Sequence, residues 1–122
     1  MEKKILIVDD SDSFREVVGT ALKRGGYDVI TAADGVDALS KLDGGKIHLI
    51  ISDVNMPRMD GISFVKEVKK MANYKFTPIC MLTTESDQSR MAEGKAAGAK
   101  AWMVKPFQPP QLLEVVSKLL PA

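Results

Sequence analysis

Five short apolar runs alternate along the chain with five stretches of helical periodicity, and this alternation constrains the fold more than any other feature. The runs are Ile5–Val8, Asp28–Ala32, Leu49–Ser52, Pro78–Leu82 and Ala101–Val104. Most are rich in Ile, Val, Leu and Met without alternating polar residues, which is typical of strands covered on both faces. The second run is the most polar, so we expect a more exposed strand there. Regular strand–helix alternation predicts an α/β doubly wound parallel sheet.

The intervening stretches carry start and stop signals of helices. We expect helices from the capping candidates at 11–13 to Gly25-Gly26, around Ala38–Leu42 before Gly44-Gly45, from Ile62 to Met71 or Ala72, from about Asp87 to Ala97, and from Pro109-Pro110 to Pro121. The fourth of these stretches has few large apolar residues. It is therefore expected to pack weakly against the sheet.

Length and charge narrow the classes of protein that fit. With 122 residues, 45% of them hydrophobic, the chain has the size and the core of one domain, which we expect to span 1–122 without an output domain. Its 17 basic and 16 acidic residues form no Lys/Arg run, so we expect no nucleic-acid binding. The apolar runs are too short to span a membrane, no signal peptide is evident, and the single Cys80 cannot form an internal disulfide. We expect a cytoplasmic protein with no membrane contact.

Polar residues follow four of the five runs directly, as Asp9-Asp10, Asp53, Thr83-Thr84-Glu85 and Lys105-Pro106. Taken singly, each has a plainer interpretation as a capping turn, a strand end or a loop. Together they favour one site, because ligands of doubly wound sheets gather at the carboxyl ends of the strands. Converging carboxylates repel by roughly 4 kcal/mol per pair at about 4 Å and an effective dielectric of about 20, so the cluster needs a cation.

The donor set favours Mg²⁺, which prefers oxygen ligands and shares its coordination shell with phosphate. A carboxylate such as Asp53 can attack phosphorus and form an aspartyl phosphate. Lys105 and the metal would neutralise the transferring group, and positioning plus charge would supply most of the catalysis.

Four segments resemble those of response-regulator receiver domains, particularly the stand-alone chemotaxis members: Ile7–Asp10, Ser52–Gly61, Thr83 and Val104–Phe107. The resemblance, and not the residue pattern, implies a flavodoxin-like fold with strand order 2-1-3-4-5. It also implies roles for individual residues. These are Asp53 as phosphoacceptor, Mg²⁺ ligands from Asp9, Asp10, Asp53 and the Asn55 carbonyl, phosphoryl contacts from Thr83 and Lys105, and a cis peptide bond before Pro106.

Two further groups of residues are tied to switching and to signal lifetime. Trp102 stands where the family usually has Tyr or Phe, and it is either a packing residue or the rotating aromatic of the switch together with Thr83. Asn55 and Glu85 are expected beside the approach of the hydrolytic water. The bulk of Thr84 is expected to slow dephosphorylation, and Arg58 is expected to pair with Glu85.

The function that the resemblance implies is a phosphorylation-activated response regulator of a two-component system, which is not an enzyme beyond promoting its own phosphorylation and dephosphorylation. A histidine kinase would supply the phosphoryl group. The output surface would be the fourth helix, fifth strand and fifth helix, including Lys95, Trp102 and Lys118. The expected partner is a flagellar-motor or other downstream protein, with a phosphatase as a possible additional partner, and we expect a monomer.

Three alternatives stay open. The chain could pass its phosphoryl group to a histidine phosphotransfer protein as a relay shuttle. An aspartate-nucleophile phosphatase of the haloacid-dehalogenase type needs a second Asp two residues after the nucleophile of the first strand, and Asp9-Asp10-Ser11 lacks that spacing. A flavodoxin-type flavin carrier needs a phosphate loop rich in Ser, Thr and Gly after the first strand, whereas an acidic loop repels phosphate.

Overall fold

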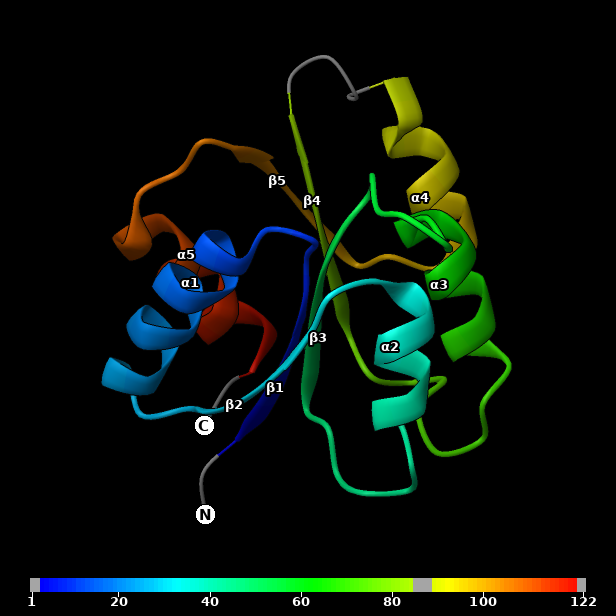
Figure 1. The fold of residues 1–122 in the computed structure, drawn as a ribbon, viewed down its shortest axis with the longest axis horizontal. Coiled ribbons are helices and arrows are strands. Elements are labelled where there is room, and N and C mark those ends of the chain that lie inside the picture. The colour runs from blue at the N-terminus through cyan, green and yellow to red at the C-terminus, as the bar shows by residue number, and fades with distance from the viewer. Residues whose placement is uncertain (1–2, 85–88, 121–122) are drawn as a thin grey trace.

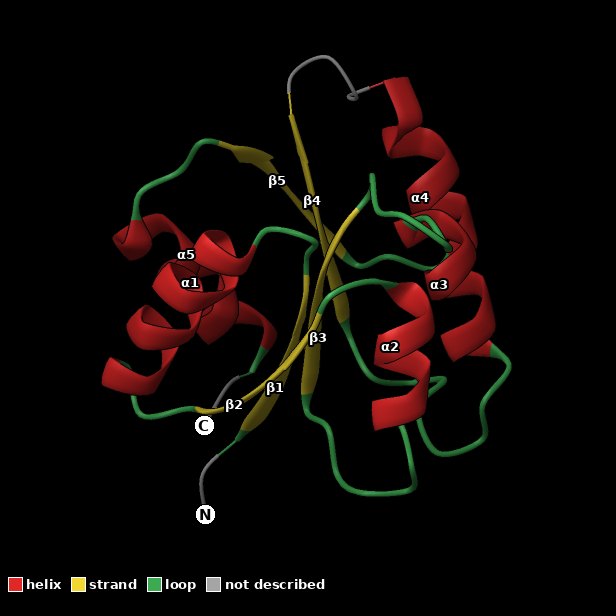
Figure 2. Ribbon diagram, viewed as in Figure 1, coloured by secondary structure: helices red, strands yellow, loops and turns green. Residues whose placement is uncertain are grey.

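The chain forms one five-stranded parallel sheet with helices on both faces (Figures 1 and 2). The computed structural model describes residues 3–84 and 89–120. The strands are β1 (Lys4–Val8), β2 (Asp28–Ala32), β3 (Leu49–Asp53), β4 (Ile79–Thr84) and β5 (Ala101–Lys105). Their order in the sheet is β2-β1-β3-β4-β5, and every neighbouring pair is parallel. The predicted fold class and the strand order are thereby confirmed.

Five α-helices cover the sheet in two layers. They are α1 (Asp12–Arg24), α2 (Gly35–Lys41), α3 (Gly61–Lys69), α4 (Met91–Ala97) and α5 (Pro109–Leu119). Helices α1 and α5 lie on one face, and α2, α3 and α4 lie on the other (Figure 1). The four helices after α1 differ from the predicted ranges by a few residues at their ends.

The core is divided by the sheet into two apolar clusters, as expected for strands buried on both faces. One cluster contains Leu6, Val8, Ile50 and Met81, and it packs under α2, α3 and α4. The other contains alternate residues of the same strands and packs under α1 and α5. Strand β2 is only partly buried, as its more polar sequence predicted.

Helix α4 is the element that differs most from its prediction. It begins at Met91, and Gly94 is its single fully buried residue, which agrees with the predicted weak packing. The predicted start at Asp87 lies outside the described residues. Gly98 ends the helix in the left-handed region, with φ of 122°. None of the helices in the described ranges is long and apolar enough to cross a membrane.

Candidate functional site

Three carboxylates meet at the carboxyl end of the sheet because β1 and β3 are neighbours. Asp9 and Asp10 follow β1, and Asp53 is the last residue of β3. One oxygen from each side chain lies within 4.8 Å of the others. Asp9 is 1% exposed, whereas Asp10 is exposed to solvent. Oxygen ligands at this spacing fit Mg²⁺, and Asp9, Asp10 and Asp53 are the residues that would hold it.

Lys105 supplies the compensating positive charge from the end of β5. Its Nζ lies 2.7 Å from Asp9 Oδ2 and 3.5 Å from Asp53 Oδ2. Asp9 Oδ1 also accepts a bond from the Ser11 backbone N–H, and Asp53 Oδ1 accepts one from that of Val54. The ammonium and the backbone donors thus hold two carboxylates in place before any ligand arrives.

The carboxyl group of Asp53 is hard to ionise in this site. Burial raises its pKa to about 6, the Lys105 ammonium opposes this rise, and the charge of Asp9 adds to it. The folded protein therefore binds a proton at Asp53 more tightly than the unfolded chain does. The contribution of this proton to stability is full below the unfolded pKa near 4, and it is lost as pH rises through about 6.

Replacing Asp53 by Asn is therefore expected to stabilise the metal-free protein at pH 7.5. We expect a gain of about 1–2 kcal/mol in the free energy of unfolding, which is below the roughly 3 kcal/mol that such a pKa shift represents for a fully desolvated group. The gain should shrink as pH falls from about 6 to about 4. Urea denaturation of Asp53→Asn and wild type across this range, in EDTA, measures it. A difference that does not vary with pH would show that Asp53 ionisation is not the cause.

The backbone around Asp53 leaves no space for a larger residue at Gly61, the first residue of α3. A Cβ at this position would lie 2.1 Å from the Asp53 carbonyl oxygen. Gly61 N–H donates to the Val54 carbonyl, and the Asp60 side chain caps α3 by accepting from Ser63 N–H. The loop between β3 and α3 is thereby packed directly against Asp53. Gly61 belongs to the segment Ser52–Gly61 that carries the family resemblance, which by itself implied no role for this residue.

Thr83, Thr84, Asn55 and Pro106 lie at the same end of the sheet. Thr83 is 1% exposed on β4, next to β5, and its hydroxyl donates to the Thr84 carbonyl. Asn55 and Thr84 are exposed, in the segment after β3 and at the end of β4 respectively. The peptide bond between Lys105 and Pro106 is cis, as the resemblance implied.

The predicted ion pair between Arg58 and Glu85 cannot be placed within the described residues, where Arg58 pairs with Asp34. The Arg58 guanidinium donates from Nε and Nη2 to the two carboxylate oxygens of Asp34, at 2.8 and 3.0 Å. Asp34 also caps α2, and Arg58 holds the pKa of this carboxyl below its usual value. The contact is bidentate, because a guanidinium matches both oxygens of one carboxylate. Glu85 lies outside the described residues.

Trp102 lies on β5 and packs against α4. Its side chain is partly buried against the cluster that contains Met81, its partner residue on β4. A Cβ at Gly94 would lie 2.5 Å from the indole ring, so this glycine lets α4 approach Trp102. Within the described part of the chain, the indole Nε1 is buried without a hydrogen-bond partner. Among the described residues, the ring is thus held by apolar packing without a polar contact at Nε1.

Comparison with known proteins agrees with this geometry. Residues 5–117 match the family described as response regulator receiver domain. The chain is 40% identical to chemotaxis protein CheY1 of Helicobacter pylori, covering 96% of each protein. The structure of Vibrio cholerae CheY4 has 51% identity and a TM-score of 0.93, covering 98% of this chain and all of the other. The receiver domain of sensor histidine kinase PA1611 from Pseudomonas aeruginosa, described with magnesium coordinated in its active site cleft, has 26% identity and a TM-score of 0.91 over the full length of both chains.

The fold, the acidic site and the family match define the class: this chain belongs to the response regulator receiver domains. Its relatives with chemotaxis names point to chemotaxis-type signalling. Receiver domains are signalling regulators of two-component systems and not classical enzymes. They bind Mg²⁺ at an acidic site, and this chain has such a site in its three-carboxylate cluster. They interact with histidine kinases and downstream targets. The cytoplasmic location stays a prediction.

Proposed function

We propose that a histidine kinase phosphorylates this chain on Asp53, with Mg²⁺ held by Asp9, Asp10, Asp53 and the Asn55 carbonyl. The observation that carries this proposal is the position of Asp53 beside Asp9 and Asp10 and within 3.5 Å of the Lys105 ammonium. A carboxylate surrounded by groups of both charges can serve as a nucleophile while its neighbours hold a cation and a phosphoryl group.

In the proposed reaction, an Asp53 carboxylate oxygen attacks phosphorus in line with the leaving group. The new P–O bond forms as the bond from phosphorus to the donor breaks, and the donor leaves with that electron pair. The Lys105 ammonium donates to one phosphoryl oxygen and the Thr83 hydroxyl to another. When bound, Mg²⁺ supplies positive charge next to the phosphoryl oxygens. The same groups would act in dephosphorylation, where Asn55 and Glu85 orient water and Thr84 narrows its approach.

The signal would leave the site through Thr83, Trp102 and α4. Thr83 now donates to the neighbouring carbonyl of Thr84, and a phosphoryl oxygen would attract its hydroxyl away from there. Trp102 would then turn toward the vacated space, and α4 would repack on it. A helix with one fully buried residue, Gly94, is a suitable element for such a change.

Phosphorylation is therefore expected to change the fluorescence of Trp102, the single tryptophan of the chain. The indole would exchange its present packing against Gly94 for another position, which alters emission intensity or wavelength. Titration of wild type with a beryllofluoride mimic and Mg²⁺ measures this change, and Asp53→Asn should give none. Emission that stays constant at saturation would remove Trp102 from the switch.

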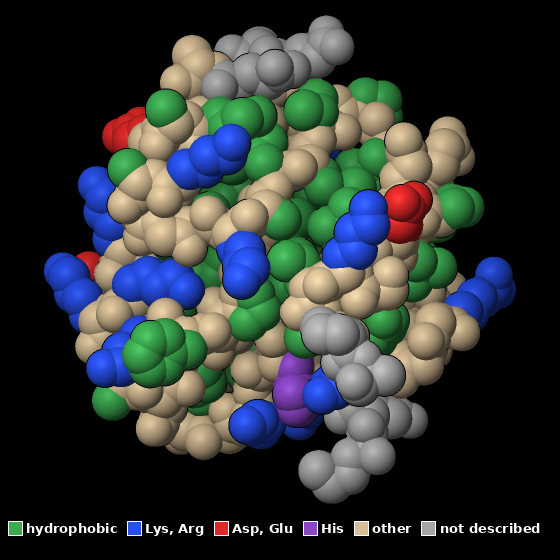
Figure 3. Space-filling model, turned by 180° about the vertical axis from the view of Figure 1, so that it is seen from behind, with side chains coloured by type: hydrophobic (Ala, Val, Ile, Leu, Met, Phe, Trp, Pro, Cys, Tyr) green, Lys and Arg blue, Asp and Glu red, His purple; other side chains and the backbone are tan. Residues whose placement is uncertain are grey.

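The proposed output surface is α4, β5 and α5, which favours an acidic partner. Strand β5 lies at the back of the molecule in Figure 1. Figure 3 shows the molecule from behind, and on this face more Lys and Arg than Asp and Glu side chains are visible. Lys95 and Lys100 lie exposed before β5, and Lys118 lies exposed on α5, where it pairs with Glu114. A flagellar-motor or other downstream segment with acidic residues would complement this charge.

A relay shuttle to a histidine phosphotransfer protein is the second candidate, because it would use the same acceptor. A haloacid-dehalogenase type phosphatase is disfavoured by the spacing after β1. The direct test of the proposed function is the intact mass of the protein after incubation with acetyl phosphate and Mg²⁺. Wild type should gain one phosphoryl group, and the gain should disappear in EDTA. A mass that stays unchanged with Mg²⁺ present would contradict phosphorylation.

A further inference from the structure

Phe14, a residue of α1 outside the predicted site, lies against the Lys105 ammonium. Nζ of Lys105 is 4.1 Å from the centroid of the Phe14 ring, within the range of a cation–π interaction. We propose that Phe14 positions Lys105 for phosphoryl transfer, an inference that rests on the proposed function. Phe14 falls within the first predicted helix, and the sequence implied no role for it.

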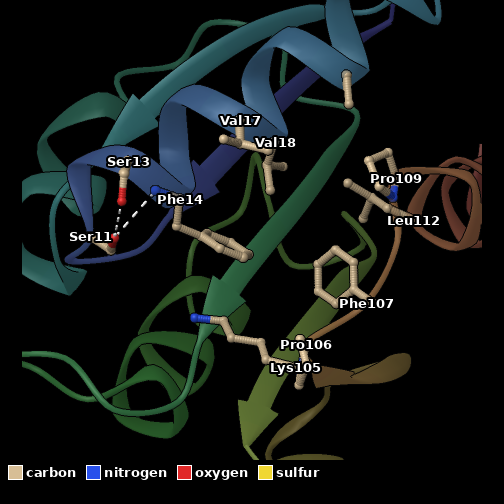
Figure 4. A pocket seen from close by; sticks show the side chains of 11 residues that line it. Ser11, Ser13, Phe14, Val17, Val18, Lys105, Pro106, Phe107, Pro109 and Leu112 are labelled. Atoms are coloured by element: carbon tan, nitrogen blue, oxygen red, sulfur yellow. Dashed lines mark hydrogen bonds between the residues drawn. The ribbon is translucent and has the colours of Figure 1, made fainter.

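Two elements fix the Phe14 ring in this position. Phe14 lies in the first turn of α1, where its backbone N–H donates to the Ser11 side chain that caps the helix. The Phe107 ring meets it edge to face, with centroids 5.9 Å apart and an interplanar angle of 84°. Phe107 follows Lys105 and Pro106 in the chain. Both rings line a pocket of about 430 Å³, with the amine of Lys105 beside the Phe14 ring (Figure 4).

The ring differs in kind from the other groups around the ammonium. Asp9 and Asp53 attract Nζ at 2.7 and 3.5 Å, but Mg²⁺ would compete for both carboxylates, and phosphorylation would convert the Asp53 carboxylate to an acyl phosphate. The attraction of the Phe14 ring would persist through these changes. The ring has no lone pair that would compete with a phosphoryl oxygen for the N–H groups of Lys105, so these groups stay available to the substrate. A flexible lysine side chain would therefore be held near its working position before the phosphoryl group arrives.

The test compares initial phosphorylation rates with acetyl phosphate at saturating Mg²⁺, followed by intact mass. Phe14→Leu keeps the apolar bulk and removes the ring, and a rate about two- to tenfold lower is expected from the size of cation–π interactions. Phe14→Trp keeps an aromatic face and should stay within about twofold of wild type. Phe14→Met provides a second variant without a ring. Val17→Ala, in the same pocket and 61% exposed, is the control and should not change the rate.

The same substitutions in a Lys105→Met background separate positioning from packing. Phe14→Leu should have no further effect there, because the ammonium on which the ring acts is gone. An equal decrease in both backgrounds would assign Phe14 a packing role and overturn the inference. Wild-type rates for both Phe14→Leu and Phe14→Met would also overturn it. If wild type itself gains no phosphoryl group, it is the proposed function that fails.

Discussion

Asp53→Asn is expected to abolish the Mg²⁺-dependent gain of a phosphoryl group from acetyl phosphate. The amide retains the shape of the side chain, and it can still accept the Val54 N–H, but it lacks the nucleophilic carboxylate oxygen. The neighbouring Asp9 is a poor substitute nucleophile, because its carboxylate is held by Lys105 and the Ser11 backbone N–H. Intact mass and peptide mapping measure the result.

Asp12→Asn is the matched control for this experiment. Asp12 lies near the site, but its side chain is 94% exposed and pairs with Arg15. We expect this variant to be labelled like wild type. Labelling of Asp53→Asn to the wild-type extent would reject Asp53 as the acceptor. Peptide mapping distinguishes that outcome from weak transfer to Asp10.

Asp10→Asn is expected to weaken Mg²⁺ binding by about ten- to a hundredfold, because the attraction of a unit negative charge for the cation is lost at contact distance. Asp10 is the exposed member of the three-carboxylate cluster, so the substitution alters charge with little change in packing. Removing one of three mutually repelling carboxylates should also stabilise the metal-free protein. Phosphorylation by acetyl phosphate should fall together with the metal affinity.

Calorimetric titration with Mg²⁺ measures the affinity of wild type, Asp10→Asn and Asp12→Asn under one set of conditions. Asp12→Asn should bind Mg²⁺ within about twofold of wild type, because its charge lies outside the cluster and is screened by solvent. An affinity of Asp10→Asn equal to that of wild type would exclude Asp10 from the metal site. Equal losses in both variants would point to general electrostatics and not to a ligand.

The residue pattern alone predicted the α/β class and the approximate position of every strand. Runs such as Ile5–Val8 and Leu49–Ser52 are apolar on both faces. This pattern can be recognised in each run by itself, without knowing which strands lie beside it. The convergence of Asp9, Asp53 and Lys105 followed from it, since carboxyl ends of parallel strands share one edge of the sheet. The strand order was not contained in the pattern and came from the family resemblance, because the pattern does not say which strands are neighbours.

Only the tertiary structure decided which long-range side-chain contacts form. Arg58 binds Asp34, 24 residues away in the chain. Lys105 stacks on Phe14, and Trp102 is packed against Gly94. Each contact depends on how a helix sits on the sheet and on which partner offers the better geometry. Burial patterns place helices on a face, but they leave the distances between individual side chains open, and those distances decide which of several charged or aromatic neighbours pair.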